Sequence, residues 1–437
     1  MLRVDFSSIL GGGTTWYGAG LLGAVKSTPT ETAICQDSIR LYQELTAQGH
    51  DLGWKQCGSL SLARTKNRMM YLKRLAATAN SQNIPCKLLT PAELENYCSQ
   101  LHLDDLEVGG VVQGGLWVEA DGVGDQLSTC LVLAAEAHRH GVAIIENCSV
   151  EQVLTDARSG VSQVMTSRGP VNCEYFVNCS GYSSRNVGRL SNPQVNVPVY
   201  PCEQYYLHTM PVDDMDPDMP VIYDHDGHIY IREYQGRYLA GGYEPISKPV
   251  DPEQLPKNTQ PIPEDWDQFY ILLQQILHRI PSMEEVQVDR LWCRPKGFTP
   301  DCKWIIGQAP EVERYFVAAG LMSKGLECAG GVGKLTADWI VNGEVDMDVL
   351  NLDIRRFLSQ HNNHLFLRDR IREAPGFHYN FHYPFSEFST GRCLRMSPLY
   401  PRLYAKGAYF GQVMGYERPC YFGSQVSGSS NSGYSVT

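Results

Sequence analysis

The sequence predicts an α/β protein in which a nucleotide-binding type of sheet is interrupted by an antiparallel domain. Capped helices alternate with short apolar strands up to about residue 181. Residues 227–244, "GHIYIREYQGRYLAGGYE", then alternate in polarity as a β-hairpin does. Residues 315–343 return to a buried strand, a glycine-rich loop and a helix. This order is typical of a nucleotide-binding domain that carries an inserted, substrate-covering domain.

Three helices are predicted before residue 150. The letters "TPTE" at 28–31 form a capping box with proline at the first helical position, and the helix that they open ends at Gly49. The letters "TPAE" at 90–93 repeat this start signal, and a third helix runs from about Asp125 to Gly141. The apolar residues expected to face the core from the first and third helices are Ile34, Leu41, Leu45, Leu127, Leu131 and Ala134.

Strands follow the third helix and lead into the antiparallel region. "VAIIENC" (142–148) and "EYFVNCSG" (174–181) are apolar runs, and the second ends in a turn at Ser180–Gly181. The hairpin of 227–244 turns at Gln235–Gly236. The segment "PEDWDQFYILLQQILHRIP" then predicts an amphipathic helix whose apolar face carries Phe269, Leu273, Ile276, Leu277 and Ile280.

The last third contains one more strand–loop–helix unit. It consists of the strand "YFVAAG" (315–320), a loop as far as Gly331, and a helix that ends at Gly343. From about Asp353 to "ERPCYFG" the sequence is rich in arginine and aromatic residues. Residues 424–437 are of low complexity, and we expect them to be disordered.

Composition excludes several classes of function. The 437 residues are 43% hydrophobic and 19% charged, which suits a globular core, and the net charge of −11 has the wrong sign for a general nucleic-acid binder. No run reaches the roughly 18 apolar residues of a membrane helix. The fourteen cysteines lack zinc-like spacing and are interpreted as reduced thiols or buried apolar residues. We therefore expect no nucleic-acid partner, no membrane span and no metal site.

Glycine-containing turns are the candidate cofactor contacts. "GLMSKGLECAGGVGK" (320–334) lies between a strand and a helix, where backbone N–H groups can approach an anionic or electron-rich ligand. A plain glycine-rich loop explains the same letters equally well, and Lys334 can be read as a solvated residue of the first helical turn. The turn after "VNCSG" (177–181) faces the nucleotide if its strand is parallel. Asp301, in "FTPDCKWIIG", is expected to be a structural turn carboxylate.

Together these stretches resemble the family of FAD-dependent amine oxidoreductases that includes the sarcosine and dimethylglycine dehydrogenases. "GGGTTWYGAG", "CGSLSLA", "VNCSG", "FTPD", "IIGQAPEVERYFVAAG" and "GGVGKLTADWIVNG" follow the order of that family from residue 11 to about 350. The resemblance implies a glutathione-reductase-like FAD-dependent oxidoreductase domain over 1–352, with an antiparallel substrate part at about 195–300. "STGRCLRMSPLYPRL" and "GYERPCYF" resemble the family's central domain, which is placed at 353–423, before a tail at 424–437.

One branch of the family is the most similar. "CEQYYLHT", "DGHIYIREYQGRYLAGGYE" and "SPLYPRLYAKGA" resemble the regulatory subunits of pyruvate dehydrogenase phosphatase. This resemblance implies a protein of the mitochondrial matrix that contacts the catalytic subunit of that phosphatase and keeps a structural or vestigial flavin site. The alternative is an enzyme that oxidises a small secondary or tertiary amine with FAD. A partial gene model or splice form is a third interpretation and is compatible with both.

Three departures from the family set the expectations for FAD. The family opens with a strand and a G-x-G-x-x-G turn for the FAD pyrophosphate, and this chain starts downstream of them, so we expect a fold without its first βα unit and weak FAD binding. Tyr17 stands where the dehydrogenases carry a flavin-linked histidine, which favours noncovalent FAD and argues against a dehydrogenase. The family's folate-type domain does not follow Gly423, so folate is not expected as an acceptor.

The resemblance assigns the cofactor contacts but no catalytic residue and no metal ligand. It places Gly331, Gly333 and Lys334 beside the flavin ring. Thr14, Thr15 and Gly181 are expected on the side of the ribityl chain and the diphosphate. The full set of expected cofactor-binding residues is Thr14, Thr15, Trp16, Tyr17, Ser180, Gly181, Gly325, Gly331, Gly333 and Lys334.

Overall fold

A mixed sheet of eight strands forms the largest part of the fold. The computed structural model describes residues 2–4, 9–104, 111–156, 160–255, 262–380 and 386–423. The strand order is β16-β12-β15-β14-β13-β3-β5-β4, and neighbours are antiparallel except for the parallel pair β13–β3. The strands are β3 (Ser59–Ala63), β4 (Cys86–Leu89), β5 (Gly114–Val118), β12 (Tyr200–Thr209), β13 (Val221–Asp224), β14 (Ile229–Glu233), β15 (Tyr238–Gly242) and β16 (Val288–Phe298).

This sheet extends beyond the region that the sequence marked as antiparallel. Three of its strands, β3 to β5, come from residues 59–118 and not from about 195–300. They join through β3, in which Leu60 pairs with Ile222 of β13. Both side chains are fully buried in the same apolar cluster. Burial in the same cluster explains why the two strands pair. The alternation of apolar and polar residues within a strand does not indicate which other strand it pairs with.

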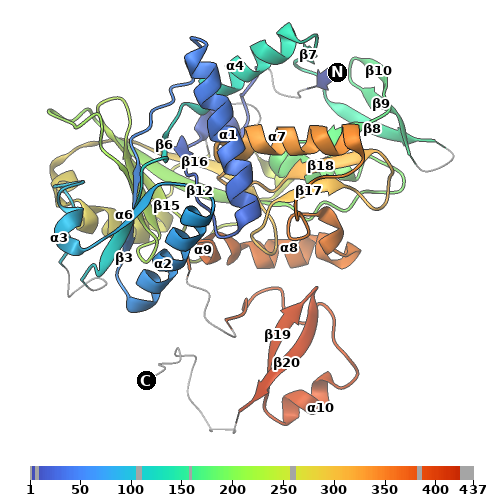
Figure 1. Cartoon of the computed structure of the whole chain (residues 1–437). Coiled ribbons are helices and arrows are strands. Elements are labelled where there is room, and N and C mark those ends of the chain that lie inside the picture. The colour runs from blue at the N-terminus through green and yellow to red at the C-terminus, as the bar shows by residue number, and fades with distance from the viewer. Residues whose placement is uncertain are drawn as a thin grey trace.

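A smaller sheet and two long helices make up the nucleotide-type part. Its strands are β11 (Phe176–Asn178), β18 (Tyr315–Ala319) and β17 (Ile305–Gln308), with β18 in the centre and parallel to β11. All five residues of β18 are buried, as its apolar letters predict. Helix α1 (Pro29–Ala47) crosses α7 (Gly325–Asn342) over this region (Figure 1). The predicted α/β architecture with an added antiparallel sheet is confirmed.

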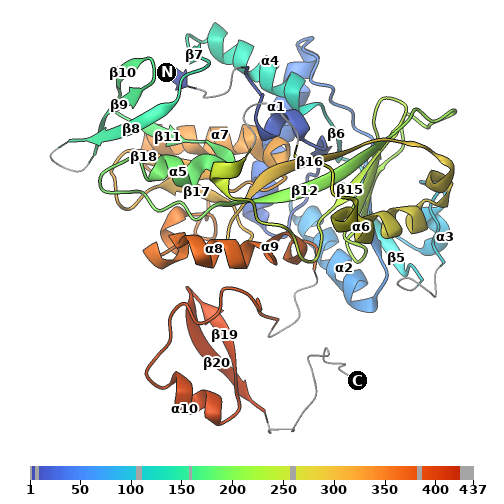
Figure 2. The ribbon, with the colours of Figure 1, turned by 180° about the vertical axis from the view of Figure 1, so that it is seen from behind.

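Shorter elements surround these two sheets (Figure 2). A three-stranded antiparallel sheet contains β8 (Val150–Thr155), β9 (Val161–Thr166) and β10 (Gly169–Asn172). The two-stranded pairs are β1 (Leu2–Val4) with β7 (Ala143–Ile145), and β2 (Leu21–Leu22) with β6 (Gly122–Val123). The remaining helices before residue 300 are α2 (Lys66–Ser81), α3 (Pro91–Leu94), α4 (Gln126–Arg139), α5 (Ser184–Gly188) and α6 (Trp266–Arg279).

The predicted helix starts are confirmed by their caps. The Thr28 hydroxyl accepts the N–H of Glu31, Thr90 and Glu93 form a capping box, and the Asp125 carboxylate accepts the N–H of Ser128. The amphipathic face of α6 is also confirmed, since Phe269 and Ile276 are fully buried.

Two sequence-based expectations are wrong. Leu131 of α4 is 47% exposed, because the helix turns Thr129 and Ala134 inward and leaves Leu131 on its outer side. The loop predicted to extend to Gly331 is also wrong, because α7 begins at Gly325 and Gly331 lies inside this helix. Tertiary contacts with α1 offset the low helix propensity of the glycines.

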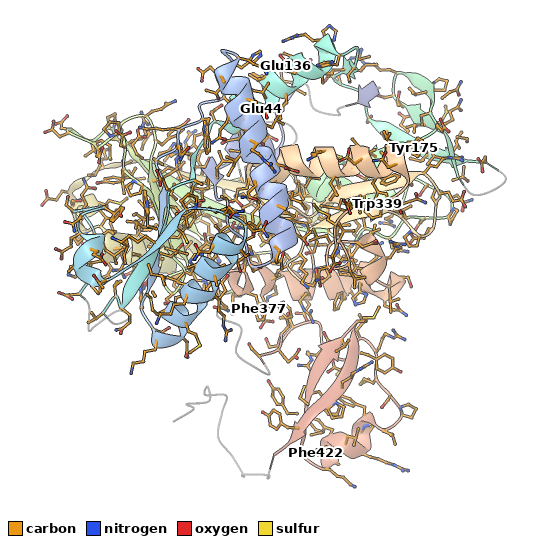
Figure 3. The ribbon with its side chains drawn as sticks, in the orientation of Figure 1. Glu44, Glu136, Tyr175, Trp339, Phe377 and Phe422 are labelled. Carbon is orange, nitrogen blue, oxygen red and sulfur yellow. The ribbon has the colours of Figure 1, made fainter. Side chains whose placement is uncertain are left out.

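The chain after residue 353 forms helices and a hairpin. Its elements are α8 (His364–Ile371), α9 (Ala374–Phe377), α10 (Tyr400–Ala405), β19 (Ala408–Val413) and β20 (Tyr416–Phe422). The hairpin and α10 lie apart from the main body (Figures 1 and 2), and Phe422 at the end of β20 is 55% exposed (Figure 3). Arg370 and Glu373 attach this unit by hydrogen bonds to Thr390. The predicted disordered tail, 424–437, lies outside the described residues.

Three further observations concern the chain as a whole. All fourteen cysteines are free thiols. None of the described helices is both long and apolar enough to cross a bilayer. In the described ranges, no group of three or more His, Cys, Asp or Glu side chains is arranged to hold a metal ion.

Candidate functional site

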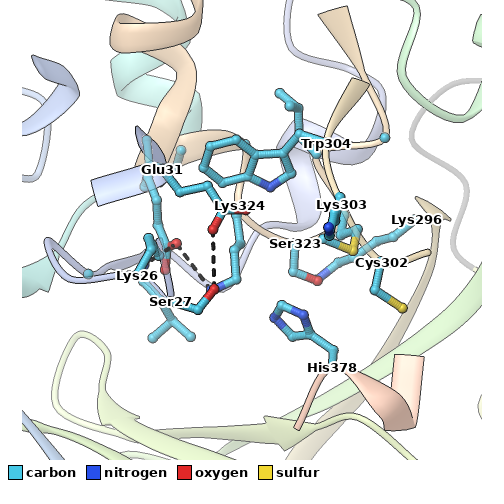
Figure 4. Close-up of a pocket in the computed structure, with 18 of the residues that line it drawn as sticks. Lys26, Ser27, Glu31, Lys296, Cys302, Lys303, Trp304, Ser323, Lys324 and His378 are labelled. Atoms are coloured by element: carbon cyan, nitrogen blue, oxygen red, sulfur yellow. Dashed lines mark hydrogen bonds and ion pairs between the residues drawn. The ribbon is translucent and has the colours of Figure 1, made fainter. Parts of the chain in front are cut away.

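A cavity of about 1220 Å³ lies where the two main parts of the fold meet. Its walls come from the loop before α1, strands β3 and β5, the hairpin β14–β15, the end of β16, the start of α7 and residues 377–380. Figure 4 shows Lys26, Ser27 and Glu31 on one side, Lys296, Cys302 and Lys303 on the other, and His378 between them. The volume exceeds that of most small-molecule pockets and is sufficient for a dinucleotide.

Glycines leave backbone groups open to a ligand at two points of the wall. Gly181 has φ +59°, and a Cβ built there would meet no atom within 4 Å; the same open space faces Gly325. Gly325 is the first residue of α7, so the helix N-terminus, with its unpaired N–H groups and partial positive charge, borders the cavity. This combination suits a phosphate or an electron-rich ring edge.

A buried ion cluster stands beside the start of α7. The Lys26 ammonium lies 2.7 Å from a Glu327 carboxylate oxygen, and Lys324 lies 3.5 Å from the same carboxylate. Burial alone would raise the pKa of Glu327, but the two lysines outweigh it and hold that pKa below its usual value. The pKa of Lys26 is raised, since the attraction of Glu327 outweighs the effect of burial. The buried Asp121 carboxyl group also lies beside Lys26, so two cations and two acidic groups meet at this point.

Aromatic side chains form another part of the cavity wall. The Tyr243 and Tyr379 rings are 4.6 Å apart, and Tyr243 and His378 are 5.3 Å apart. Burial, with help from Arg68, lowers the pKa of His225 to about 3, so this imidazole is neutral at pH 7. The residues of this aromatic wall are Tyr223, His225, Tyr230, Tyr243, His378 and Tyr379.

Lys296 and Glu244 are two further buried titratable groups near the cavity. Lys296 of β16 is 6% exposed, and its ammonium donates to the Ser323 hydroxyl at 3.0 Å. Burial lowers the pKa of Lys296 to about 8. Glu244 is 1% exposed, and burial raises its pKa to about 8. Each group opposes the effect of burial on the other, because Glu244 raises the pKa of Lys296 and Lys296 lowers the pKa of Glu244.

The raised pKa of Glu244 predicts a pH dependence of stability. The folded state keeps this proton up to about pH 8, whereas the unfolded chain releases it near its ordinary value of 4.5. The free energy of unfolding of the wild type should therefore fall between pH 5 and pH 8 relative to that of Glu244→Gln, by at least about 1.4 kcal/mol, the equivalent of one pKa unit. Denaturant unfolding of both proteins across this range measures the difference. Parallel stability curves would contradict the assignment.

The structure brings together only some of the expected cofactor residues. Thr14, Thr15, Gly181 and Gly325 line the cavity. Thr14 and Thr15 belong to a short 3₁₀ helix, Thr14–Tyr17, and the Thr14 hydroxyl donates to the Pro295 carbonyl at 3.1 Å. Contact of these residues with a cofactor stays a prediction.

Tyr17 is not among the residues that line the cavity. Its ring is 2% exposed, lies 4.1 Å from the Arg294 guanidinium carbon, and meets the Trp292 ring edge-on at 5.5 Å. Trp16 is 42% exposed and is not part of the lining. The Ser180 hydroxyl donates to the Asn178 side chain at 2.6 Å, which orders the turn that presents Gly181.

Of the remaining three expected residues, Gly331 and Lys334 contact α1, and Gly333 faces away from it. A Cβ on Gly331 would lie 2.0 Å from the carbonyl oxygen of Ile34, and the Gly331 N–H donates to the Ser38 hydroxyl at 2.9 Å. Gly333 is exposed, with no atom near its Cβ position. Lys334 is also exposed and lies 3.0 Å from the Asp37 carboxylate. Their predicted place beside the flavin stays untested, and their contacts are those of helix packing and a surface ion pair.

Sequence reasoning missed the lysines of the cavity and one glycine pattern. Lys26 and Lys296 are isolated in the sequence, so no spacing signals them. Gly18, Gly20 and Gly23 do match G-x-G-x-x-G, and all three line the cavity. However, β2 lies inside this pattern and α1 begins only at Pro29, so the pattern lacks the strand–turn–helix context of a dinucleotide-binding turn.

These features fit FAD. The open backbone at Gly181 and Gly325 can approach the cofactor closely, and the N-terminus of α7 favours its anionic or electron-rich groups. The aromatic wall can cover an apolar ring system.

Comparisons with known protein families agree with this geometry. Residues 4–339 match the model of the FAD dependent oxidoreductases, and residues 342–397 match the FAD dependent oxidoreductase central domain. The structure of L-proline dehydrogenase from P. horikoshii superimposes with a TM-score of 0.69 at 19% identity, covering 80% of this chain and 96% of that one. At this identity the similarity establishes the fold alone.

Two similar sequences carry named functions. The mitochondrial pyruvate dehydrogenase phosphatase regulatory subunit of Mus musculus is 38% identical over 94% of this chain and 47% of its own length. The mitochondrial sarcosine dehydrogenase of Mus musculus is 32% identical over 94% of this chain and 45% of its own length. The chain thus spans about half the length of the curated relatives that it matches.

Proposed function

Because the chain belongs to the family of FAD-dependent oxidoreductases, we propose that it binds FAD noncovalently in the cavity and acts as a regulatory subunit of a phosphatase. Tyr17 is the observation that carries this proposal. Its phenol is buried against Arg294 and Trp292, outside the lining of the cavity, and is not placed to attach a flavin. The 38% identity to a pyruvate dehydrogenase phosphatase regulatory subunit, against 32% to sarcosine dehydrogenase, supports the same choice.

The proposed partner is the catalytic subunit of pyruvate dehydrogenase phosphatase, and the proposed compartment is the mitochondrial matrix. Both follow from the relatives, whose names place them in mitochondria. In this role Gly181, Gly325 and the cluster of Lys26, Glu327 and Lys324 hold the cofactor as part of the fold.

Oxidation of a small secondary or tertiary amine is the second candidate function. FAD supplies the hydride acceptor for such a reaction. The aromatic wall favours this candidate, because rings such as Tyr243 and Tyr379 attract a substituted ammonium through their faces. The neutral His225 adds no repelling charge to that wall.

We expect whatever flavin the purified protein carries to be released completely when the protein is precipitated with acid. The reason is that Tyr17, which stands at the position of the flavin-linked histidine, lies outside the lining of the cavity. Tyr17→Phe should keep the same flavin content, since the ring contacts with Arg294 and Trp292 remain. Flavin left in the precipitate of the wild type, and lost in Tyr17→Phe, would contradict noncovalent binding.

Partner binding separates the two candidate functions. Immobilised protein should retain the purified catalytic subunit of pyruvate dehydrogenase phosphatase and change its phosphatase activity. Reduction of a redox dye that depends on an added secondary amine, without retention of the phosphatase, would favour the oxidoreductase instead.

A further inference from the structure

The hairpin of β19 and β20 exposes an apolar face. Tyr409 and Tyr421 lie opposite each other on the two strands, and their stacked ring centroids are 5.0 Å apart. Tyr409 is 42% exposed, Val413 on the same side of β19 is 49% exposed, and Arg418 is also exposed. The other side of the hairpin is covered, because Phe410 is buried against α10. We call Tyr409, Val413, Arg418 and Tyr421 the hairpin face.

Both edges of the hairpin are protected against the addition of another strand. Pro419 lies within β20 and has no N–H to donate. The N–H of Gln412 on β19 donates to the Glu387 carboxylate at 3.2 Å. A partner is therefore expected to pack on the hairpin face and not to extend the sheet. Burial of this face would also stabilise the unit, since a two-stranded hairpin is marginally stable by itself.

The unit that carries the hairpin is basic, although the whole chain is acidic. Residues 386–423 contain five basic and two acidic side chains, whereas the net charge of the chain is −11. Arg392 is paired with Glu417. Arg402, Lys406 and Arg418 are exposed, and none of the described carboxylates lies within ion-pair distance of them. An apolar face on a basic unit fits a partner surface that is apolar and acidic.

The outer side of α6 has this complementary character. Trp266 is 39% exposed, Tyr270 58% and Ile271 47%, while the inner side of the helix is buried on the eight-stranded sheet (Figure 2). Residues 262–277 contain three acidic and no basic side chains. Two of the acidic residues, Glu264 and Asp267, are exposed next to Trp266. We call these five residues the α6 face.

A hollow of about 370 Å³ adjoins the α6 face. It lies between Ile271 and Leu272 of α6 and Pro245. The charged residues of its lining, Arg64 and Asp226, are each held in an ion pair, so the hollow does not require a charged ligand. Aromatic side chains that fill such hollows are the usual anchors of protein interfaces. The tyrosines of the hairpin face are side chains of this kind.

We propose that the hairpin face of one copy packs on the α6 face of a second copy of this chain. The opposite charges attract the two copies, and the aromatic side chains of both faces supply the buried contact. Because each copy carries both faces, two copies exchange them reciprocally and the assembly closes as a symmetric dimer. This contact is separate from the large cavity and depends neither on a flavin nor on a phosphatase.

Sedimentation equilibrium of the full chain measures this contact. At micromolar concentrations the mass of the wild type should approach that of a dimer, and added salt should weaken the association because it screens exposed charges. Tyr409→Ser and Tyr270→Ser should each raise the dissociation constant at least about tenfold, as the loss of an aromatic anchor does. Val341→Ser is the matched control, since Val341 is 80% exposed on α7 and belongs to neither face.

A mixture of the two tyrosine variants identifies which surfaces meet. The α6 face is intact in Tyr409→Ser, and the hairpin face is intact in Tyr270→Ser. The mixture should therefore associate more tightly than either variant alone. Hairpins that packed on each other would give no such recovery, and this result would contradict the proposed contact.

Other outcomes would also overturn the proposal. They are a monomeric wild type, or association that is equally tight in the wild type and in both tyrosine variants. If Tyr409→Ser unfolds the hairpin, Arg418→Glu replaces it in the same tests, because it keeps the stacked pair of Tyr409 and Tyr421. A monomeric chain whose hairpin face instead binds a different acidic protein would assign the face to that protein and not to a second copy.

Discussion

Replacing Asp224 with alanine should lower the free energy of unfolding by about 3–5 kcal/mol. Asp224 ends β13 and is fully buried. Its carboxylate accepts hydrogen bonds from Arg64 Nε at 2.9 Å and Nη2 at 2.6 Å, and from Arg279 Nε at 3.0 Å. Removal of the carboxylate leaves two buried guanidinium groups without their common counter-charge, and this is the most costly kind of lost ion pair.

Asp218→Ala is the matched control for this prediction. Asp218 also pairs with a cation, Lys55, at 2.9 Å, but its side chain is 79% exposed. Such surface pairs contribute about 0–1 kcal/mol. Denaturant unfolding followed by circular dichroism compares the two variants with the wild type. Losses of similar size in both would mean that Asp224 and its two arginines do not support the fold as a buried unit.

The same carboxylate predicts a response to acid. Burial raises the pKa of Asp224, but Arg279 and Arg64 outweigh it and hold the pKa below the ordinary value of 3.8. A lowered pKa stabilises the folded state at pH above the unfolded value, and this contribution is lost as the pH falls through the folded pKa. The stability gap between wild type and Asp224→Ala should therefore be constant near neutral pH and narrow below about pH 4.

Local elements could be predicted from the sequence because local contacts determine them. Thr28 and Asp125 cap their helices through N–H groups only three residues away. The turn at Gln235–Gly236 has φ values of +52° and +76°, which the short-range alternation of the hairpin and its glycine foretell. Side-chain periodicity likewise gave the buried face of α6.

Long-range contacts could not be predicted in this way. The parallel pairing of Leu60 with Ile222 depends on which strands the folded chain brings together, and both strands have similar apolar letters. The ion pair of Lys26 with Glu327 joins the two ends of the nucleotide-type part. Lys296 carries no signal in its neighbours and acquires its chemistry only through burial. More of the fold than of the candidate site could therefore be predicted from the sequence.

Gly331 is a residue whose presence in the sequence has two possible physical explanations. In the sequence it belongs to a glycine-rich run, which is typical of a cofactor loop and equally of close helix packing. In the structure it lies one and a half turns inside α7, where its missing side chain lets α1 approach. The hydrogen bond from its N–H to Ser38 fixes this crossing point. Sequence alone could not distinguish these explanations, because α1 lies nearly 300 residues away.

Gly331→Ala is expected to lower the free energy of unfolding by about 2–3 kcal/mol, although alanine is the better helix former by about 1 kcal/mol. The new Cβ would lie 2.0 Å from the Ile34 carbonyl oxygen and 2.9 Å from its Cα, so the backbone of α1 must move. Gly333→Ala is the control in the same helix: it is exposed, meets no atom within 4 Å, and should gain about 0.5–1 kcal/mol. Thermal and denaturant unfolding, with flavin absorbance recorded on the same samples, separate packing from cofactor binding. If Gly331→Ala is as stable as the wild type, or if Gly333→Ala loses flavin without losing stability, these glycines serve the cofactor and not the contact between α1 and α7.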